Sequence, residues 1–246
     1  MEEFLYPQEL YLDPLKRIIL ARKIIEGAGK NIIKNLEYYN NEGNDLNQEI
    51  ITIKNHLSNL EFFSNINELM AIEGTIRNLY YKSFQKFLKN TFQFSGRKKH
   101  PPDNPLNAMI SFGNSLLYTI TINAIYHTQL DQTISFLHEP SERRFSLALD
   151  ISEIFKPLLV DRTIFKLINK DIINENDFIK ELNGCLLNKS GKEKFIRDFE
   201  ERLKTTIKHR NLGRNVTYER LIYLESLKLS KHLLGLEEYS PFVIWW

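Results

Sequence analysis

A histidine, a proline and two acidic residues lie close together in the middle of the sequence and could bind a metal ion. His138 precedes Pro140, and Asp150 and Glu153 follow, three residues apart. Positions i and i+3 share one face of a helix, so a helix here would point both carboxylates in one direction. One imidazole and a few carboxylates suit Mg²⁺ or Mn²⁺ better than structural zinc, which usually takes thiolates or several histidines. The alternative is an acid pair in the first turn of a helix and a loop histidine, with no metal bound.

Another acid, Glu73, lies inside a helical pattern earlier in the chain. Apolar residues recur around it at helical spacing: Leu69, Ile72, Ile76, Leu79 and Phe84. Asn65, with Glu68 three positions later, predicts where this helix begins. A half-buried carboxylate in the middle of a helix needs a partner. Arg77, four residues on, is the simplest partner, and a metal ion is the alternative.

Basic residues form two groups that could contact nucleic acid. Residues 97–102 (RKKHPP) predict a basic loop, and Asn107 follows in the first turn of the next expected helix. Between Arg202 and Arg220 there are six lysines and arginines and a single acid, Glu219. Phosphate contacts are one interpretation of both groups, and solvated surface is the other. Asn107 could equally bond the backbone N–H groups of its own helix turn.

The composition limits the class of protein. The chain has 246 residues, with 33 basic and 31 acidic side chains and a net charge of +2. This balance excludes a uniformly polycationic nucleic-acid coat but permits local basic grooves. A single cysteine, Cys185, excludes an intrachain disulfide and a thiolate zinc cluster, and predicts a small buried group in a protein of the reducing cytoplasm. No secretory signal and no apolar run of about 18 residues is visible, so we expect no membrane span.

The elements that must position these residues are long helices, because only 10 glycines and 8 prolines punctuate the chain. The caps and apolar spacings predict helices from Pro14 to about residue 40, over 46–62, from Asn65, from Pro105 and from about Asp150, with a bend or restart at Pro157. Residues 169–187 predict a polar break with a short helix, and two helices are expected over 189–235, divided at Leu212-Gly213. The fold class is all-α. The apolar residues 239–246 are expected to pack on the domain or on a partner.

Three segments taken together resemble the family of CRISPR-associated adaptation integrases. They are residues 70–80, residues 101–113, and residues 137–140 with 146–157 and 160–162. The first resembles the family's helix with its first metal-binding glutamate, the second its proline and asparagine segment, and the third its second and third metal-ligand blocks. Their order, spacing and flanking residues agree with the family. Members begin with a β-rich N-terminal domain, followed by a larger α-helical catalytic domain. By this resemblance residues 1–12 form an entry segment or linker, residues 13–246 form the multi-helix catalytic domain, and the β-rich domain is absent.

The resemblance also implies the site residues. The metal ligands carried over are Glu73, His138 and Glu153, with Asp150 as a further ligand or a base beside the ligands. In some members the third ligand is an aspartate, so which of Asp150 and Glu153 binds the ion directly stays open. The implied cofactor is Mg²⁺ or Mn²⁺. The candidates for DNA contacts are Asn107 and Lys156, then Arg143 and Arg144, and from the basic segments Arg97, Lys208 and Arg210.

The activity implied is metal-dependent DNA strand transfer. A DNA 3′-hydroxyl attacks a phosphodiester at the edge of a repeat array and joins a short captured fragment to it, whereas water in its place gives endonuclease activity. The implied partners are double-stranded or branched DNA, a second copy of the chain, and the small ferredoxin-fold companion protein of the adaptation complex. The alternative is a catalytically silent α-helical DNA-binding or scaffold module. In it the acids pair with Arg77 and Lys156, and the Trp245-Trp246 end docks on another protein.

Overall fold

The computed structural model describes residues 13–89, 92, 94, 96–98, 101–139, 144–181, 184–209 and 212–245. The predicted entry segment 1–12 and the candidate DNA contacts Arg143 and Arg210 lie outside these residues, as does Trp246. The α-helices are α2 (Pro14–Asn41), α3 (Asn47–Ser58), α4 (Ile66–Phe87), α5 (Pro105–Tyr126), α6 (Ser146–Lys156), α7 (Arg162–Asn169), α8 (Lys189–Lys204) and α9 (Tyr218–Leu233). Shorter elements are the 3₁₀ turns η1 (Leu60–Phe62) and η3 (Glu175–Asp177), the π-helical turn η2 (Pro157–Asp161), and the strands β1 (Phe178–Glu181), β2 (Gly184–Leu187), β3 (Thr206–Lys208) and β4 (Asn215–Thr217).

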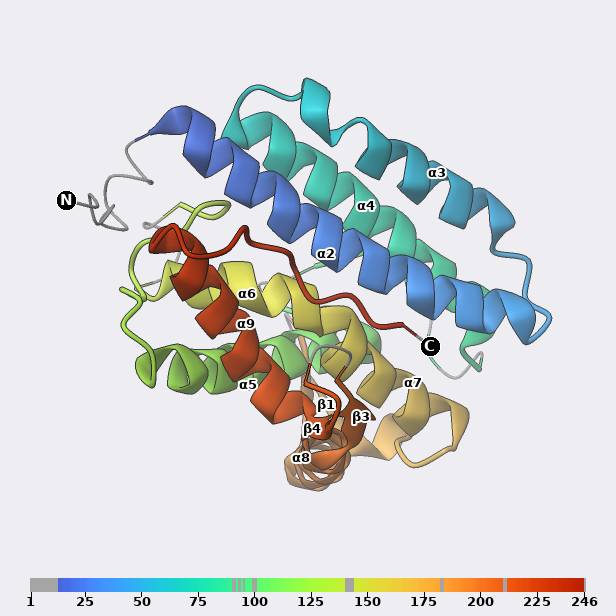
Figure 1. The fold of residues 1–246 in the computed structure, drawn as a ribbon. Coiled ribbons are helices and arrows are strands. Elements are labelled where there is room, and N and C mark those ends of the chain that lie inside the picture. The colour runs from blue at the N-terminus through green and yellow to red at the C-terminus, as the bar shows by residue number, and fades with distance from the viewer. Residues whose placement is uncertain are drawn as a thin grey trace.

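Helix α6 lies at the centre of the arrangement. Helices α2, α3 and α4 form one layer, and α6 packs under α2 with α5 on its other side (Figure 1). Helices α5 and α6 form the second layer, and α9 crosses this layer in contact with both. The apolar faces of these helices form one continuous core. A residue on α6 can therefore meet residues of both layers.

The predicted helix starts are confirmed where a cap and a proline coincide. Asp13 Oδ1 accepts hydrogen bonds from the backbone N–H of Leu15 (3.0 Å) and Lys16 (3.3 Å) ahead of α2. Asn104 caps α5 in the same way, with proline at the first helical position. Such caps satisfy backbone donors that have no partner inside the helix. These local signals position the two long helices.

The all-α class is confirmed, with two short antiparallel hairpins that were not predicted. In place of the short helix expected in residues 169–187, the turn η3 leads into the β1–β2 hairpin. Hairpin β3–β4 separates α8 from α9, around the predicted division at Leu212-Gly213. Gly213 has φ +63°, a left-handed conformation that glycine adopts without strain. Strands of three or four residues leave almost no periodicity in a sequence, so composition alone did not reveal them.

Helix α5 is long and apolar enough to cross a membrane when judged by length and composition alone. Its most apolar window has a mean hydropathy of 1.2 and is 44% buried inside the protein. Asparagine, serine and threonine side chains interrupt the apolar run, which is why we expected no span here. In the fold α5 packs against α6, α9 and β2, as the core helix of a domain does.

Gly113 on α5 is expected to be intolerant of a side chain. A methyl group at this position would lie 2.6 Å from Cγ1 of Val160 and 2.8 Å from Cζ of Phe195. We therefore expect Gly113→Ala to lower the free energy of unfolding by about 1–3 kcal/mol, measured by urea denaturation. Gly74 in α4 is the matched control, because a methyl group there meets no atom within 4 Å. Gly74→Ala should instead stabilise by about 0.5–1 kcal/mol, and equal losses in both variants would contradict the packing argument.

The segment 239–245 runs in an extended conformation between α2 and α6, as predicted for a segment too apolar to remain in solvent (Figure 1). Asn31 on α2 accepts a hydrogen bond from the backbone N–H of Ile244 (2.9 Å) and donates to the carbonyl of Phe242 (3.0 Å). Glu225 on α9 accepts from the Tyr239 hydroxyl (2.7 Å). Two buried polar side chains thus attach this segment to both layers of the fold.

Candidate metal centre

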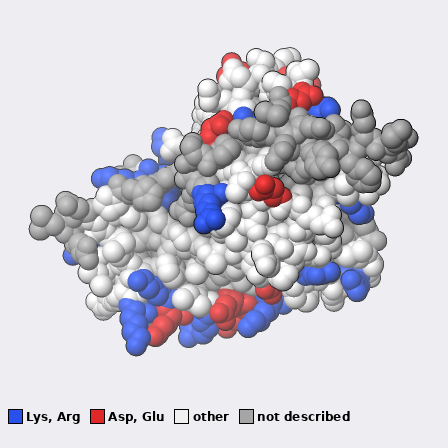
Figure 2. All heavy atoms as spheres, turned by 90° about the vertical axis from the view of Figure 1, so that its left-hand side faces the viewer, with Lys and Arg blue, Asp and Glu red and all other residues white. Residues whose placement is uncertain are grey.

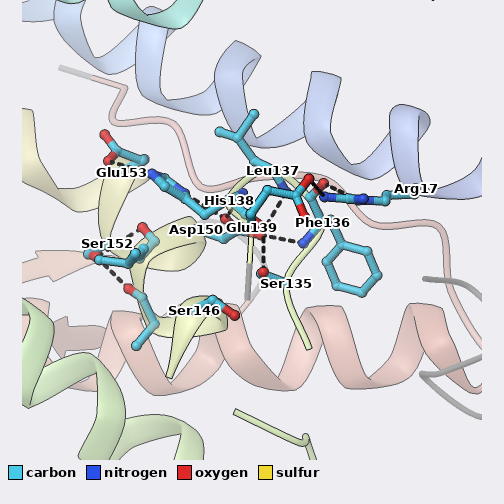
Figure 3. Close-up of polar contacts among 12 residues, drawn as sticks. Arg17, Ser135, Phe136, Leu137, His138, Glu139, Ser146, Asp150, Ser152 and Glu153 are labelled. Atoms are coloured by element: carbon cyan, nitrogen blue, oxygen red, sulfur yellow. Dashed lines mark hydrogen bonds and ion pairs between the residues drawn. The ribbon is translucent and has the colours of Figure 1, made fainter. Parts of the chain in front are cut away.

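Asp150 organises the loop that carries His138 (Figure 3). Its side chain is fully buried on α6. Oδ2 accepts from the backbone N–H groups of Phe136 (2.6 Å) and Leu137 (3.0 Å), and Oδ1 accepts from the backbone N–H of His138 (3.0 Å) and its Nδ1 (2.8 Å). A carboxylate has about four lone-pair directions, so these four contacts use it fully. Asp150 therefore serves to position His138 and its loop.

The contact with Asp150 also sets the chemistry of His138. A carboxylate oxygen only accepts, so Nδ1 carries the proton and Nε2 holds the lone pair. Nε2 lies 3.9 Å from Oε1 of Glu153. Burial acts to lower the pKa of His138, but the hydrogen bond to Asp150 and the charges of Asp150 and Glu153 outweigh it and raise the pKa above 6.5. An imidazole oriented by a carboxylate in this way is the usual arrangement of a metal-binding histidine.

Glu153 is buried between two cations. Its Oε2 pairs with a terminal nitrogen of Arg77 from α4, and its Oε1 pairs with Nζ of Lys156 one turn along α6. Burial acts to raise the pKa of Glu153, but the charges of Lys156, Arg77 and His138 hold it well below its usual range. Pro157 has no N–H to donate to the carbonyl of Glu153, and Arg77 faces that carbonyl at 3.5 Å.

Glu73, on α4, pairs with the same guanidinium that contacts Glu153 of α6. Its Oε1 lies 3.1 Å from Nε of Arg77, as the spacing of four residues predicted. The Glu73 side chain is 24% exposed and that of Glu153 is 5% exposed. One arginine thus joins the acids of α4 and α6.

These donors suit the implied ion in type. One imidazole nitrogen and two carboxylates match the ligand preferences of Mn²⁺ and Mg²⁺. Among the described residues, no three histidine, cysteine or acidic side chains stand close enough together to hold an ion as placed. Arg77 and Lys156 fill the space beside the carboxylates and supply positive charge there. A divalent ion would take over that charge once these two side chains moved aside.

Asp161 is a buried acid beside this centre to which the sequence analysis assigned no role. It ends the π-helical turn η2, it is fully buried, and neither oxygen accepts a hydrogen bond of good geometry from a described residue. Burial raises its pKa to about 7, although the charges of Arg77 and Lys156 and the nearby Tyr80 hydroxyl act to lower it. The only signal in the sequence was its place in the Val160-Asp161-Arg162 block.

Asp161→Asn is expected to stabilise the fold in a pH-dependent way. The folded protein holds a proton on Asp161 up to about pH 7, whereas the unfolded chain loses it near 3.8, so wild-type stability falls as the pH rises between these values. Asparagine has nearly the same shape and cannot ionise. The gain should approach about 1–3 kcal/mol above pH 7 and shrink toward pH 3.8, as measured by denaturation at several pH values. A gain that does not depend on pH would contradict the titration of Asp161.

Asn107 forms its hydrogen bonds inside the protein. Its side chain is fully buried, and its amide donates to the carbonyl of Gly96 (2.9 Å) and to Asp103 (2.8 Å). Its oxygen accepts from Arg97 (3.1 Å), which also donates to Ser111 (3.0 Å). Every polar atom of its side chain is thus bonded inside the protein, and the role of Asn107 in orienting DNA phosphate stays a prediction. The local role, including a bond from its N–H to the Asn104 cap, is the one observed.

The other candidate DNA contacts are scattered. Lys156 is 15% exposed beside Glu153, while Arg144 and Lys208 are exposed. Lys208 belongs to β3, so the basic segment around it is a hairpin between two helices and not one helix face. Figure 2 shows basic and acidic residues alternating along one edge of that view, with a basic and an acidic group near the middle. On that view the described residues form no broad basic band.

The fold and the site together define an all-helical domain with a buried histidine–carboxylate centre built from two layers. The sequence matches the family described as CRISPR associated protein Cas1 over residues 5–201. The chain belongs to this family, which confirms the resemblance inferred from its three segments.

Individual relatives are similar over nearly the whole chain. A "CRISPR-associated endonuclease Cas1 3" of Thermodesulfovibrio yellowstonii is 53% identical over 238 residues, covering 97% of this chain and 72% of the relative. A CAS1 protein from Thermotoga maritima superposes with a TM-score of 0.83 at 39% identity, covering 93% of this chain and 69% of that one. A structure titled "Casposase bound to integration product" gives a TM-score of 0.84 at 25% identity, covering 96% and 69%.

Proposed function

We propose that the chain is a metal-dependent DNA endonuclease and integrase of CRISPR adaptation, which joins short DNA fragments to a repeat array by transesterification. The observation that carries this proposal is the orientation of His138 by Asp150, which turns Nε2 toward Glu153, while Glu73 lies on the same guanidinium as Glu153. The endonuclease names of relatives and the casposase titled as bound to an integration product support the reaction class.

Glu73, His138 and Glu153 would hold Mg²⁺ or Mn²⁺. When bound, such an ion neutralises charge on the reacting phosphate and lowers the pKa of the attacking hydroxyl or water. Asp150 has no oxygen left for an ion, so its part is to keep His138 in the tautomer that binds through Nε2. His138 must be neutral to bind, and its raised pKa means that the neutral form is already being lost at a pH above 6.5.

Arg77 and Lys156 have a second part in this proposal. Both cations pair with Glu153 here. When the carboxylates turn to the ion, the two positive charges become available to a DNA phosphate at the same place. With Arg97, Arg144 and Lys208 they would contact the backbone and not the bases, so little sequence readout is expected. A second copy of the chain and the small companion protein are proposed partners. Only the companion protein has support from the titles of "Cas6-RT-Cas1--Cas2" complexes that share this fold.

One observation favours the catalytically silent alternative. Glu73 and Glu153 are already neutralised by Arg77 and Lys156, as that reading predicted. A buried carboxylate paired with two cations has no need of a metal. In this case the domain would bind DNA or a partner protein without cutting DNA.

Thermal unfolding during a Mn²⁺ titration separates the two functions. A ligand that binds only the folded state raises the melting temperature, so the wild-type chain should become more stable as Mn²⁺ is added. His138→Ala should remove this stabilisation. His127→Ala replaces an exposed histidine outside the centre and should keep it. If the melting temperature of the wild-type chain does not change as Mn²⁺ is added, the result would support the catalytically silent module.

A further inference from the structure

A cavity of about 380 Å³ opens where the ends of α2, α4 and α8 meet helix α7. The C-terminal end of α2 and helix α7 lie together at the right of Figure 1. The described residues around this cavity include four basic side chains, Arg162, Lys166, Lys170 and Arg202, against one carboxylate, Glu42. The whole chain has a net charge of only +2, so this is a local concentration of positive charge.

Arg162 and Lys166 lie on one face of α7, and Lys170 is the residue that ends the helix. Arg162, Lys166 and Lys170 follow one another at intervals of four residues, which places them in one row on a helix. Lys166 is paired with Asp198 (2.5 Å) and Glu201 (3.1 Å). Lys170 is exposed and forms no ion pair with any residue that the structure describes. The row therefore ends at Lys170, which lines the cavity and has no acidic partner among the described residues.

Arg202 lines the cavity from α8. Its Nε donates to the carbonyl of Leu158, and its guanidinium lies 5.5 Å from the ring centroid of Tyr218. No acidic side chain in the described part of the chain forms an ion pair with it. Burial, with the positive charge of Arg162 nearby, lowers the pKa of Arg202 to about 10. Two guanidiniums that repel each other at a half-buried wall would be stabilised by an anion between them.

An aromatic surface completes the cavity. Tyr38 is 46% exposed, and the guanidinium of Arg162 lies 5.1 Å from the centroid of its ring. Tyr39 meets the edge of Tyr38 at 5.1 Å and stacks on Phe87 at 4.1 Å. The packed Tyr39–Phe87 pair holds the Tyr38 ring in place. A flat, partly exposed ring next to arginines suits an unpaired base.

We propose that this cavity binds one nucleotide unit of single-stranded DNA, with the phosphate at Arg202, Arg162 and Lys170 and the base against Tyr38. Backbone charge combined with base stacking is how proteins bind single strands without reading sequence. Lys156 at the metal centre and Arg162 at the cavity are joined by the turn η2. Six residues of helix span about 9 Å, so the metal centre and the cavity lie at the two ends of this short, buried turn. The choice of DNA as ligand rests on the proposed function, whereas the binding itself needs no metal.

Fluorescence anisotropy with a labelled short oligothymidylate in EDTA tests the stacking contact. Tyr38→Ala should weaken binding by about tenfold, while Tyr38→Phe, which keeps the ring, should stay within about twofold. A strand carrying bromodeoxyuridine should crosslink to the peptide that contains Tyr38. Equal affinities of the wild type and Tyr38→Ala would overturn the proposal.

Salt dependence tests the phosphate contact. Lys170→Gln should reduce the slope of log affinity against log salt by about 0.7, the value for one phosphate of a single strand. Lys192→Gln on α8 removes an equally exposed lysine outside the cavity and should leave the slope unchanged. Unchanged slopes in both variants would remove the phosphate contact from the proposal.

Competition separates a strand from a free ligand. The unlabelled oligonucleotide should displace the labelled strand far better than thymidine monophosphate or inorganic phosphate does. Displacement at equal concentrations by thymidine monophosphate would mean a mononucleotide site and would overturn the assignment to a strand. EDTA removes free metal ions from all these binding measurements. A failure to bind the strand would therefore not argue against the metal-dependent reaction. Likewise, strand binding can still be measured if the metal centre is inactive.

Discussion

Glu73→Ala should abolish Mn²⁺-dependent cleavage and strand transfer on a branched DNA, lowering the rate by at least about a thousandfold. Loss of one carboxylate ligand removes several kcal/mol of stabilisation from the charged transition state, and each 1.36 kcal/mol is about tenfold in rate. The fold should survive, because Glu73 is 24% exposed and Arg77 keeps its contact with Glu153. Gel-based assays of product formation, together with the melting temperature of the variant, measure both effects.

Glu68→Ala is the matched control for this variant. It removes the other acid of α4, whose Oε2 accepts only from the backbone N–H of Ser64 in the described structure (3.0 Å). It should keep wild-type activity and lose no more than a few tenths of a kcal/mol of stability. If Glu73→Ala cleaves and joins DNA as fast as Glu68→Ala does, Glu73 is no ligand and its contact with Arg77 is structural.

Asp150→Ala should destabilise the domain by about 3–5 kcal/mol, more than an ordinary buried substitution. The change leaves the backbone N–H groups of Phe136, Leu137 and His138 without their acceptor in a buried loop. Each buried donor without a partner costs about 1–3 kcal/mol, and the three losses overlap because the loop relaxes as one unit. Guanidinium denaturation followed by circular dichroism gives the free energy of unfolding.

Asp150→Asn distinguishes the loop from the histidine. Asparagine keeps a carbonyl oxygen for the loop but loses the negative charge, so the loss of stability should be smaller than for alanine. The negative charge of Asp150 is one of the causes that raise the pKa of His138, so this pKa should fall in the variant. NMR titration of the imidazole measures it. A His138 pKa that stays unchanged in Asp150→Asn would show that the two side chains are not coupled.

The sequence predicted best what local rules decide. Asp13 and Asn104, each followed by proline, fixed the starts of α2 and α5 because a cap and its helix are adjacent in the chain. The contact of Glu73 with Arg77 followed from helical spacing alone. The family resemblance then brought together Glu73, His138 and Glu153, which no local rule connects.

The remaining features depend on contacts between distant residues. The sequence did not reveal that Asp150 accepts from the loop of His138, because this depends on how the loop folds back over α6. The burial of Asn107 under Arg97 could not be predicted from the sequence, because it depends on the path of the preceding loop. Nothing in the sequence indicated that the carboxylate oxygens of Asp161 are buried without a hydrogen-bond partner of good geometry among the described residues. This property depends on the packing of the core and not on the neighbours of Asp161 in the chain.

The bond between Asn31 and Ile244 has a consequence for the order of folding. It joins residues 213 positions apart, so it closes a loop that contains most of the chain, including α6 and α9. Contacts between residues so far apart in the sequence form slowly, because the chain between the two residues must first be arranged. Once α2 and α9 have packed against α6, little loop-closure entropy remains to oppose the bond. We therefore expect the 239–245 segment to dock last, with the amide of Ile244 gaining protection from hydrogen exchange after those of α2.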